Sequence, residues 1–224
     1  MEDQIAAQLL LRVQEHRHYF ETFQEGVIAR FRRDPRLNGC PPVLHSIRAR
    51  MKSEQSLRQK FDRKHTDGNP ITVENLFSRV TDIAGVRVLH LFQEDFSAIH
   101  ECVTDQVRRG DWVLAEPPKA YTWDPESSAF FEGFGLNVEV KETFYTSIHY
   151  VVRPRADSEV ACEIQARTLF EEIWGEIDHQ INYPVPTTSL ACREQLRVLA
   201  RLVGAGSRLA DAIYRTDREA KGAV

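Results

Sequence analysis

The feature that most constrains the fold is a change of hydrophobic period within residues 161–181. In "ACEIQAR" the residues alternate, so that Glu163, Gln165 and Arg167 fall on one side and apolar residues fall on the other. This alternation predicts a strand with one apolar and one charged face. The apolar residues that follow step by three and four. They predict a helix that holds the strand against the core through Phe170, Ile173, Trp174 and Ile177.

Patterns elsewhere in the chain indicate a mixed sheet between helices. Strand-like runs cover 43–52, 83–92, 136–141, 145–152 and 160–167, and helical patterns cover 3–32, 54–64, 96–110, 168–183 and 187–218. We expect long loops over 112–134, which contain Pro117, Pro118 and Gly133. These elements predict an α/β (α+β) fold with a mixed β-sheet of about five strands flanked by helices.

The same patterns predict how the chain is divided. We expect an N-terminal helix within 1–38, a central domain over 39–185, and a C-terminal helical extension over 186–224 that packs on the same domain. With 42% hydrophobic residues, a chain of this length can bury a sizeable core.

Composition excludes several classes of protein. A formal net charge of −4 argues against a general nucleic-acid coat, whose affinity comes from many Lys and Arg contacts to phosphate. The four cysteines form no C-x-x-C pair, which argues against a zinc knuckle and a small disulfide scaffold. No apolar run approaches the roughly 20 residues that span a bilayer, and the acidic start "MEDQ" is unlike a secretory signal. We expect a cytoplasmic protein without a membrane partner.

A basic face precedes the second helix. Arg48, Arg50 and Lys52 alternate with apolar residues, so three like charges share one strand face and favour an anionic partner. Ser56 and Lys60, one helical turn apart, lie near the amino end of the following helix, where phosphate binds readily. Taken alone, the face could equally be a solvated strand edge.

Two further groups suggest nucleotide chemistry. Asp82 precedes the most apolar strand, where a carboxylate can hold Mg²⁺ together with substrate phosphates, although a turn residue is the alternative. Tyr145, Ser147 and His149 share a strand face and could stack on and hydrogen-bond to a nucleobase, although His149 could be structural. The chain has no Walker loop, no G-x-G-x-x-G and no nucleophile elbow.

A di-iron helical bundle is an alternative to weigh. Two E-x-x-H pairs are present, Glu15 with His18 and Glu176 with His179, and such pairs build di-iron sites in bundles. Glu15, however, lies about 200° around its helix from Val13 and points off the apolar face. The strand-rich middle of the chain also does not fit a bundle.

Taken in order, the motifs resemble the synthetase domain of the RelA/SpoT family, which makes guanosine tetra- and pentaphosphate. The residues that carry the resemblance are "RMKSEQSLRQK" (50–60), "DIAGVRV" (82–88), "KETFYTSIH" (141–149), "EIQART" (163–168) and "WGEIDHQINY" (174–183). The resemblance implies a nucleotidyltransferase-like sheet. It also implies a GTP pyrophosphokinase that moves the β,γ-pyrophosphate of ATP to the ribose 3′-hydroxyl of GDP or GTP with Mg²⁺.

Residue roles follow from the resemblance, motif by motif. The ATP-binding residues would be Arg50, Lys52, Ser56 and Lys60. Asp82 and Glu163 would be catalytic and hold the metal, with Glu163 assisting the metal or taking the hydroxyl proton. The acceptor nucleotide would be bound by Tyr145, which stacks on guanine, and by Lys141, His149 and Gln165. Arg48 and Arg167 share the relevant faces. Arg87 has the opposite parity to Asp82 and is expected to face elsewhere.

Departures from the family pattern define the alternatives. Phe144 stands where the family usually has glycine, so the acceptor loop is expected to differ in shape, and Ala166 replaces a larger apolar residue. No His-Asp hydrolase motif precedes the synthetase motifs, as in the small single-domain members. Such members are often homo-oligomers. Some instead modify adenine nucleotides or the 3′ end of tRNA, for which basic residues are available at Arg30, Arg32, Arg33, Arg36, Arg193, Arg197 and Arg201. An inactive nucleotide sensor is a further alternative.

Overall fold

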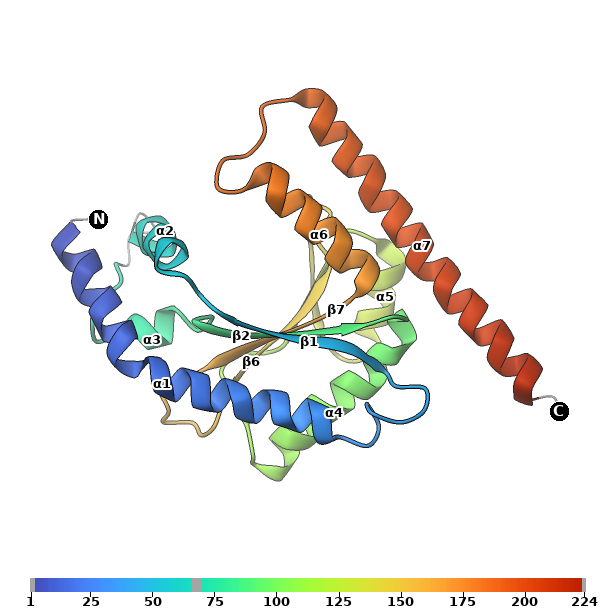
Figure 1. Ribbon diagram of the computed structural model, residues 1–224, viewed down its shortest axis with the longest axis horizontal. Helices are drawn as coiled ribbons and strands as arrows, with labels where there is room; N and C mark the ends of the chain where they lie inside the picture. The colour runs from blue at the N-terminus through green and yellow to red at the C-terminus, as the bar shows by residue number, and fades with distance from the viewer. Residues whose placement is uncertain (1–2, 66–69, 223–224) are drawn as a thin grey trace.

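A seven-stranded mixed sheet lies between two layers of helices (Figure 1). The computed structural model of the chain describes residues 3–65 and 70–222. The strand order is β1-β2-β7-β6-β4-β5, with β3 paired to β6. The pairs β2·β7 and β4·β5 are parallel and the others antiparallel. The strands are β1 (Leu44–Met51), β2 (Ala84–His90), β3 (Val113–Leu114), β4 (Lys119–Thr122), β5 (Asn137–Val140), β6 (Ser147–Arg153) and β7 (Cys162–Thr168).

One face of the sheet is covered by α1 (Asp3–Arg33) and α4 (Phe96–Arg109), with the short α3 (Leu76–Arg79) beside them (Figure 1). Apolar residues of α1 recur at helical spacing and are fully buried, among them Phe20, Val27 and Phe31. They join the strand residues Val86 and Ile164 in one hydrophobic core. This core fixes the apolar face of the central strands, so the opposite face of the same strands is free to carry polar groups.

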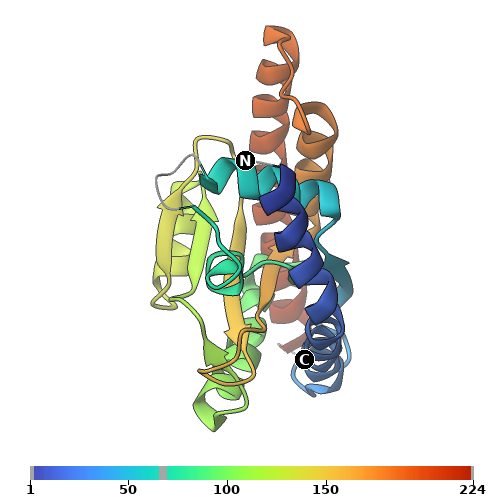
Figure 2. The same ribbon diagram turned by 90° about the vertical axis from the view of Figure 1, so that its left-hand side faces the viewer.

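The other face carries α2 (Glu54–His65), α6 (Leu169–Asn182) and α7 (Leu190–Gly222) (Figure 1). Ser53 caps α2 by accepting a hydrogen bond from Ser56 N at 3.2 Å. Thr168 begins α6 with a capping box shared with Glu171. Trp174 Nε1 donates to Leu196 O at 3.1 Å and joins α6 to α7. In both views the first turns of α7 extend beyond the rest of the molecule (Figures 1 and 2).

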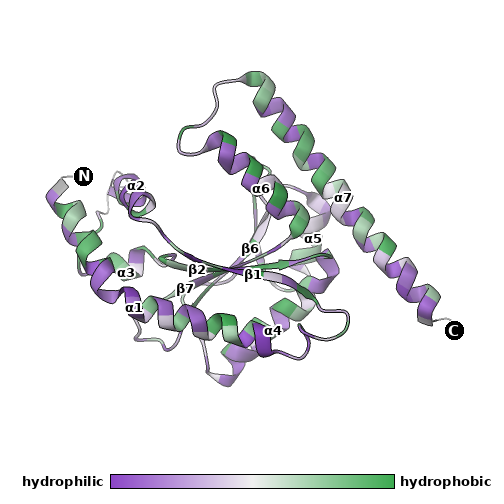
Figure 3. Cartoon of the chain, in the orientation of Figure 1, coloured by the Kyte–Doolittle hydropathy of each residue, from purple (hydrophilic) through white to green (hydrophobic). Residues whose placement is uncertain are grey.

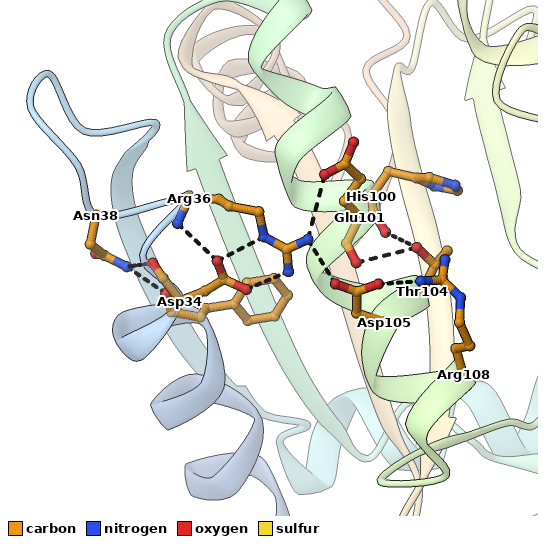
Figure 4. Close-up of polar contacts among 9 residues, drawn as sticks. Asp34, Arg36, Asn38, His100, Glu101, Thr104, Asp105 and Arg108 are labelled. Atoms are coloured by element: carbon orange, nitrogen blue, oxygen red, sulfur yellow. Dashed lines mark hydrogen bonds and ion pairs between the residues drawn. The ribbon is translucent and has the colours of Figure 1, made fainter.

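The connection from α1 to β1 is held by an ion-pair network (Figure 4). Arg36 contacts Asp34 at 2.7 Å, Asp105 of α4 at 2.8 Å and Glu101 at 3.4 Å. The hydrogen bonds that Arg36 donates to Asp34 raise the pKa of the guanidinium, and burial opposes this effect only in part. The network ties the loop before β1 to α4. It also engages one of the arginines that the sequence offered as an RNA contact.

Three expectations from the sequence are wrong. The sheet has seven strands rather than about five. The region 112–134, expected to be loops, contains β3, β4 and the helix α5 (Pro125–Glu132), which Asp124 caps. Of the four apolar α6 residues expected to pack, Ile173 and Ile177 do not, since they are 55% and 39% exposed. Among the α6 residues expected to pack, Trp174 is buried and contacts α7.

The di-iron alternative is also excluded. Its two E-x-x-H pairs lie in α1 and α6, which are on opposite faces of the sheet (Figure 1). Separately, no helix within the described ranges is long and apolar enough to cross a membrane.

Candidate active site

One face of the central strands gathers the charged residues. The pairings across β1, β2 and β7 are Arg48 with Arg87, Arg50 with Gly85, Gly85 with Glu163, and Arg87 with Gln165. Directly paired residues point to the same side of a sheet. On this side a cavity of about 620 Å³ lies between the sheet and α6. The shared faces predicted from alternation in β1 and β7 are confirmed, and Arg48, Arg50, Gln165 and Arg167 from these faces line one cleft.

The expectation that Arg87 faces away from this cleft is wrong. Its parity was counted from Asp82, but β2 begins at Ala84, so the alternation does not extend back that far. Arg87 lines the cavity, and its Nη1 lies 2.8 Å from Glu172 and 2.9 Å from Glu176. Burial lowers the pKa of Arg87, but the two carboxylates outweigh this effect and raise it.

Asp82 is held between two lysines at one end of this face. Its Oδ2 lies 2.9 Å from Lys52 Nζ, and its Oδ1 lies 2.6 Å from Lys60 Nζ. Lys52 follows β1, and its backbone N donates to Ile83 O at 2.8 Å, which places it beside the start of β2. Burial disfavours the charge of Asp82, but the lysines outweigh it and lower its pKa to about 2. The structure thus brings together Lys52, Lys60 and Asp82, which the sequence had linked to phosphates and metal.

Ser56 lies where α2 approaches the end of α6. Its Oγ is 2.9 Å from Ser53 Oγ and 3.4 Å from the Tyr183 hydroxyl. The same hydroxyl donates to Gln59 of α2. Tyr183 follows α6 and also stacks on His179, with the ring centroids 4.5 Å apart. These contacts join α2 and α6 above the sheet, next to the cleft that Tyr183 lines.

Three of the four predicted acceptor residues, Tyr145, His149 and Gln165, form a closed ring of hydrogen bonds with Glu163 and Arg167. Glu163 Oε1 is 3.0 Å from His149 Nδ1, and His149 Nε2 is 3.0 Å from the Tyr145 hydroxyl. Arg167 Nη2 donates to that hydroxyl at 2.8 Å and to Gln165 Oε1 at 3.1 Å. Gln165 Nε2 donates to Glu163 Oε2 at 2.7 Å and closes the ring. Because each member fixes its neighbour, the ring holds the Tyr145 side chain and the Glu163 carboxylate in one arrangement.

Glu163 and Asp82 fit a divalent metal by their chemistry. Burial raises the pKa of Glu163, but the hydrogen bond and charge of His149 outweigh it, so the pKa is lowered. Asp82 precedes β2, which begins at Ala84, and Glu163 pairs with Gly85 of that strand, so both carboxylates lie near the same end of β2. Carboxylate oxygens are the ligands that Mg²⁺ prefers. Within residues 3–65 and 70–222, no cluster of three or more His, Cys, Asp or Glu could hold a metal by itself.

Lys141 lies at the rim beside a residue that the sequence did not reveal. Its Nζ is 4.5 Å from the centre of the Tyr121 ring, and it also pairs with Glu139. The Tyr121 ring stands edge-on to His149, with centroids 4.9 Å apart. Tyr121 was missed because β4 was read as loop. Buried and half-buried residues do alternate in "KAYT", but four residues are too few for this alternation to predict a strand clearly.

Phe144 adopts the backbone conformation that glycine favours. Its φ is 61°, in the left-handed region that residues other than glycine and asparagine rarely adopt. Its ring packs on Trp123, with centroids 5.0 Å apart. Phe144 therefore stands in a backbone conformation that the family glycine would readily adopt.

Glu172 is a second residue of the site that sequence reasoning missed. It is 3% exposed, although it belongs to the polar positions of α6. It contacts Arg48 at 3.1 Å and Arg167 at 3.4 Å, as well as Arg87. The periodicity of α6 separates a polar from an apolar side but does not say which side faces the sheet. The structure turns the polar side toward the cleft.

Comparison of the chain with known proteins identifies its family. The profile of the family described as "Region found in RelA / SpoT proteins" matches residues 49–188, more than half of the chain. The chain belongs to this family. All five motifs that carry the resemblance lie within the matched residues.

Individual RelA/SpoT relatives agree in sequence and fold. GTP pyrophosphokinase YwaC of Bacillus subtilis (strain 168) is 27% identical over 147 residues, which cover 66% of this chain and 61% of that protein. The chain thus matches less than two thirds of that relative's length. The fold is similar to that of small alarmone synthetase 1 from Bacillus subtilis, with a TM-score of 0.69, 20% identity and coverage of 92% and 96% of the two chains. The same relative bound to its product pppGpp gives a TM-score of 0.66 at 21% identity, covering 96% and 99%.

Proposed function

We propose that the chain is a GTP pyrophosphokinase that makes (p)ppGpp from ATP and GDP or GTP. The observation that carries the proposal is the placement of two carboxylates, Asp82 and Glu163, between a lysine pair and the Tyr145–His149 ring within a RelA/SpoT region. The named activity of the YwaC relative and the pppGpp bound by the structural relative agree with it.

In the proposed reaction the ribose 3′-hydroxyl of the acceptor attacks the β-phosphorus of ATP. The new bond joins the 3′-oxygen to that phosphorus, the bond to the α,β-bridging oxygen breaks, and AMP leaves. The hydroxyl proton passes to a base or to water. Such a transfer depends on neutralising phosphate charge and aligning the two oxygens.

The donor nucleotide would lie along β1 and α2. Lys52, Lys60 and Ser56 would hold the phosphates of ATP, while Arg50 would contact its nucleoside. Because both lysines now contact Asp82, the phosphates would draw them away and leave that carboxylate available. Mg²⁺ held by Asp82 and Glu163 would supply charge neutralisation at the transferred group.

The acceptor would lie against the ring. Tyr145 would stack on guanine, with Lys141, His149 and Gln165 near its ribose and phosphates. The lowered pKa of Glu163 favours the role of metal ligand over that of base, because a general base works best with a pKa near the working pH. These substrates are nucleotides of the cytoplasm, where we propose that the protein acts.

The test is transfer of label. Protein is incubated with γ-labelled ATP and Mg²⁺ and, in turn, with GDP, GTP, AMP, ATP and deacylated tRNA. Label on GDP or GTP is expected, and Glu163→Gln and Asp82→Asn should each abolish it while the circular dichroism spectrum stays unchanged. Label on no acceptor would refute an enzyme and leave the inactive sensor. Label on tRNA alone would refute the proposed acceptor.

A tRNA acceptor has less support. It would need basic surface outside the cleft, yet Arg30 pairs with Asp111 at 3.0 Å and Arg36 is held by Asp34 and its neighbours. An engaged guanidinium offers less to a phosphate backbone. We therefore favour a free nucleotide.

Self-association is a second part of the proposal, supported by α7. Hydrophobic bands recur along this helix (Figure 3), and Val198, Leu202, Leu209 and Ile213 are 55–64% exposed on the side opposite the buried Ala200 and Ser207. Their spacings of four, seven and four residues are symmetric. A second copy in antiparallel orientation would place Leu202 against Leu209 and bury both. Light scattering should give at least a dimer, and Leu202→Asp with Leu209→Asp should give a monomer.

A further inference from the structure

Glu172 occupies an unusual position in the cleft. It lies in the first turns of α6 and is 3% exposed, and it contacts one arginine from each of three neighbouring strands. Its Oε1 is 2.8 Å from Arg87 Nη1 of β2 and 3.1 Å from Arg48 Nη1 of β1. Its Oε2 is 3.4 Å from Arg167 Nη1 of β7. One buried carboxylate thus faces three guanidinium groups.

The arginines need this carboxylate. Arg48 and Arg87 are directly paired across β1 and β2, and like charges in such pairs repel. Arg167 is only 4% exposed, so water cannot solvate its charge. Glu176 relieves part of the charge, but among the described residues the arginine that it reaches is Arg87 alone, and its side chain is 54% exposed. If Glu172 only neutralised charge, its role would be structural. The geometry of its contacts distinguishes a structural role from a functional one.

The contacts between Glu172 and the arginines leave some buried polar atoms of the described residues without a hydrogen-bond partner. Glu172 Oε2 and Arg167 Nε are both buried and have no hydrogen-bond partner within the described part of the chain. Arg167 is instead drawn the other way, because its Nη2 donates to the Tyr145 hydroxyl at 2.8 Å and to Gln165 at 3.1 Å. A carboxylate placed only to neutralise Arg167 would be expected closer, within ordinary hydrogen-bonding distance. Glu172 thus lies between two sets of arginines: Arg48 and Arg87 contact its Oε1, and Arg167 lies near its Oε2.

The two sets belong to different halves of the cleft. Arg48 and Arg87 adjoin Arg50 on the half assigned to ATP, and Arg167 supports Tyr145 on the half assigned to the acceptor. We propose that Glu172 is a positioning residue that couples the donor and acceptor subsites, with one oxygen acting on each. The proposal rests on the proposed function. A nucleotide phosphate that draws Arg48 or Arg87 toward itself would release Glu172 for a closer contact with Arg167.

The test measures binding of each nucleotide by calorimetry. The probes are a non-hydrolysable ATP analogue and GDP, each alone and each in the presence of the other. In the unaltered protein the analogue should tighten GDP binding, and by reciprocity GDP should tighten the analogue equally. Glu172→Gln keeps the size of the side chain and removes its charge. It should weaken both nucleotides about tenfold, which corresponds to about 1.4 kcal/mol each, and abolish the mutual effect.

Glu176→Gln is the matched control, because this glutamate lies one turn further along α6 and contacts Arg87 alone. It should weaken the ATP analogue only and keep the mutual effect. Should Glu172→Gln fail to fold in a thermal melt, Glu172→Asp decides. It keeps the buried charge, but it is one methylene too short to reach both sets, so the mutual effect should be lost.

Two results would overturn the inference: folded Glu172 variants with unaltered affinities and mutual effect, or a loss in Glu176→Gln identical to that in Glu172→Gln. If the unaltered protein binds neither nucleotide, the proposed function itself fails.

Discussion

Replacing Gly175 with alanine tests how tightly the Arg167 guanidinium is held. Gly175 lies inside α6, and a Cβ built there would be 2.9 Å from Arg167 Nη1, closer than such contacts occur. In an open helix the change would stabilise by about 1 kcal/mol. Here Arg167 must move, and it would lose at least one hydrogen bond from a charged donor, to Tyr145 or Gln165, worth about 1.5–3 kcal/mol. The net expectation is destabilisation by about 1 kcal/mol.

Urea unfolding provides the measurement, with Gly26→Ala as the control. Gly26 lies within α1 and has nothing within 4 Å of a Cβ, so its alanine variant should be about 1 kcal/mol more stable than the parent. Because Arg167 supports Tyr145, Gly175→Ala should also weaken GDP more than the ATP analogue. If Gly175→Ala is stabilised as much as Gly26→Ala and binds GDP unchanged, Arg167 is free to move and the argument from its partners is refuted.

Three further variants probe single features. Burial raises the pKa of Glu171 from 4.5 to about 7, so the folded state favours the protonated form and its stability falls as the pH rises from 4.5 through 7. Glu171→Gln keeps the capping box and should gain up to about 3 kcal/mol in urea unfolding at pH 8.5 but little at pH 4.5; equal gains would contradict this. Phe144→Gly should be about 1 kcal/mol more stable than Phe144→Ala, because φ is positive there; the opposite order would refute the strain. Lys60→Met should strengthen Mn²⁺ binding to the nucleotide-free protein several-fold by electron paramagnetic resonance, because Asp82 loses a cation 2.6 Å away; unchanged binding would count against Asp82 as a ligand.

Alternation predicted the faces of the site because it depends only on local geometry. Gln165 and Arg167 line the cleft, and Glu163 shares their strand face and hydrogen-bonds to Gln165, as their period of two requires. The same rule failed for Arg87, because the alternation was counted from Asp82, which lies before the first residue of β2. Parity holds only where the backbone is extended, and a sequence does not mark that end to within a residue.

Features that depend on distant partners were not predictable. The strand β4 has four residues and is defined by its pairing with β5 and β6, which a local pattern does not reveal. Likewise, nothing near Glu172 in sequence shows that three strands bring arginines to it. The packing expected of Ile173 and Ile177 in α6 failed for a related reason. An amphipathic helix is expected to bury its apolar side, but here the sheet face beneath it is charged.

Helix α6 links the interior of the cleft to the outer surface. One side of this helix supplies Glu172 to the arginines, and its other side leaves Ile173 and Ile177 exposed. A helix with both sides in use cannot shift at one side without shifting at the other. If a second copy covers the exposed side, it also restrains the carboxylate that couples the two nucleotides. The monomeric Leu202→Asp and Leu209→Asp variant should therefore keep its fold but show a weaker mutual effect of the ATP analogue and GDP. An unchanged effect in that monomer would separate the two sides of the helix and confine the coupling to the cleft.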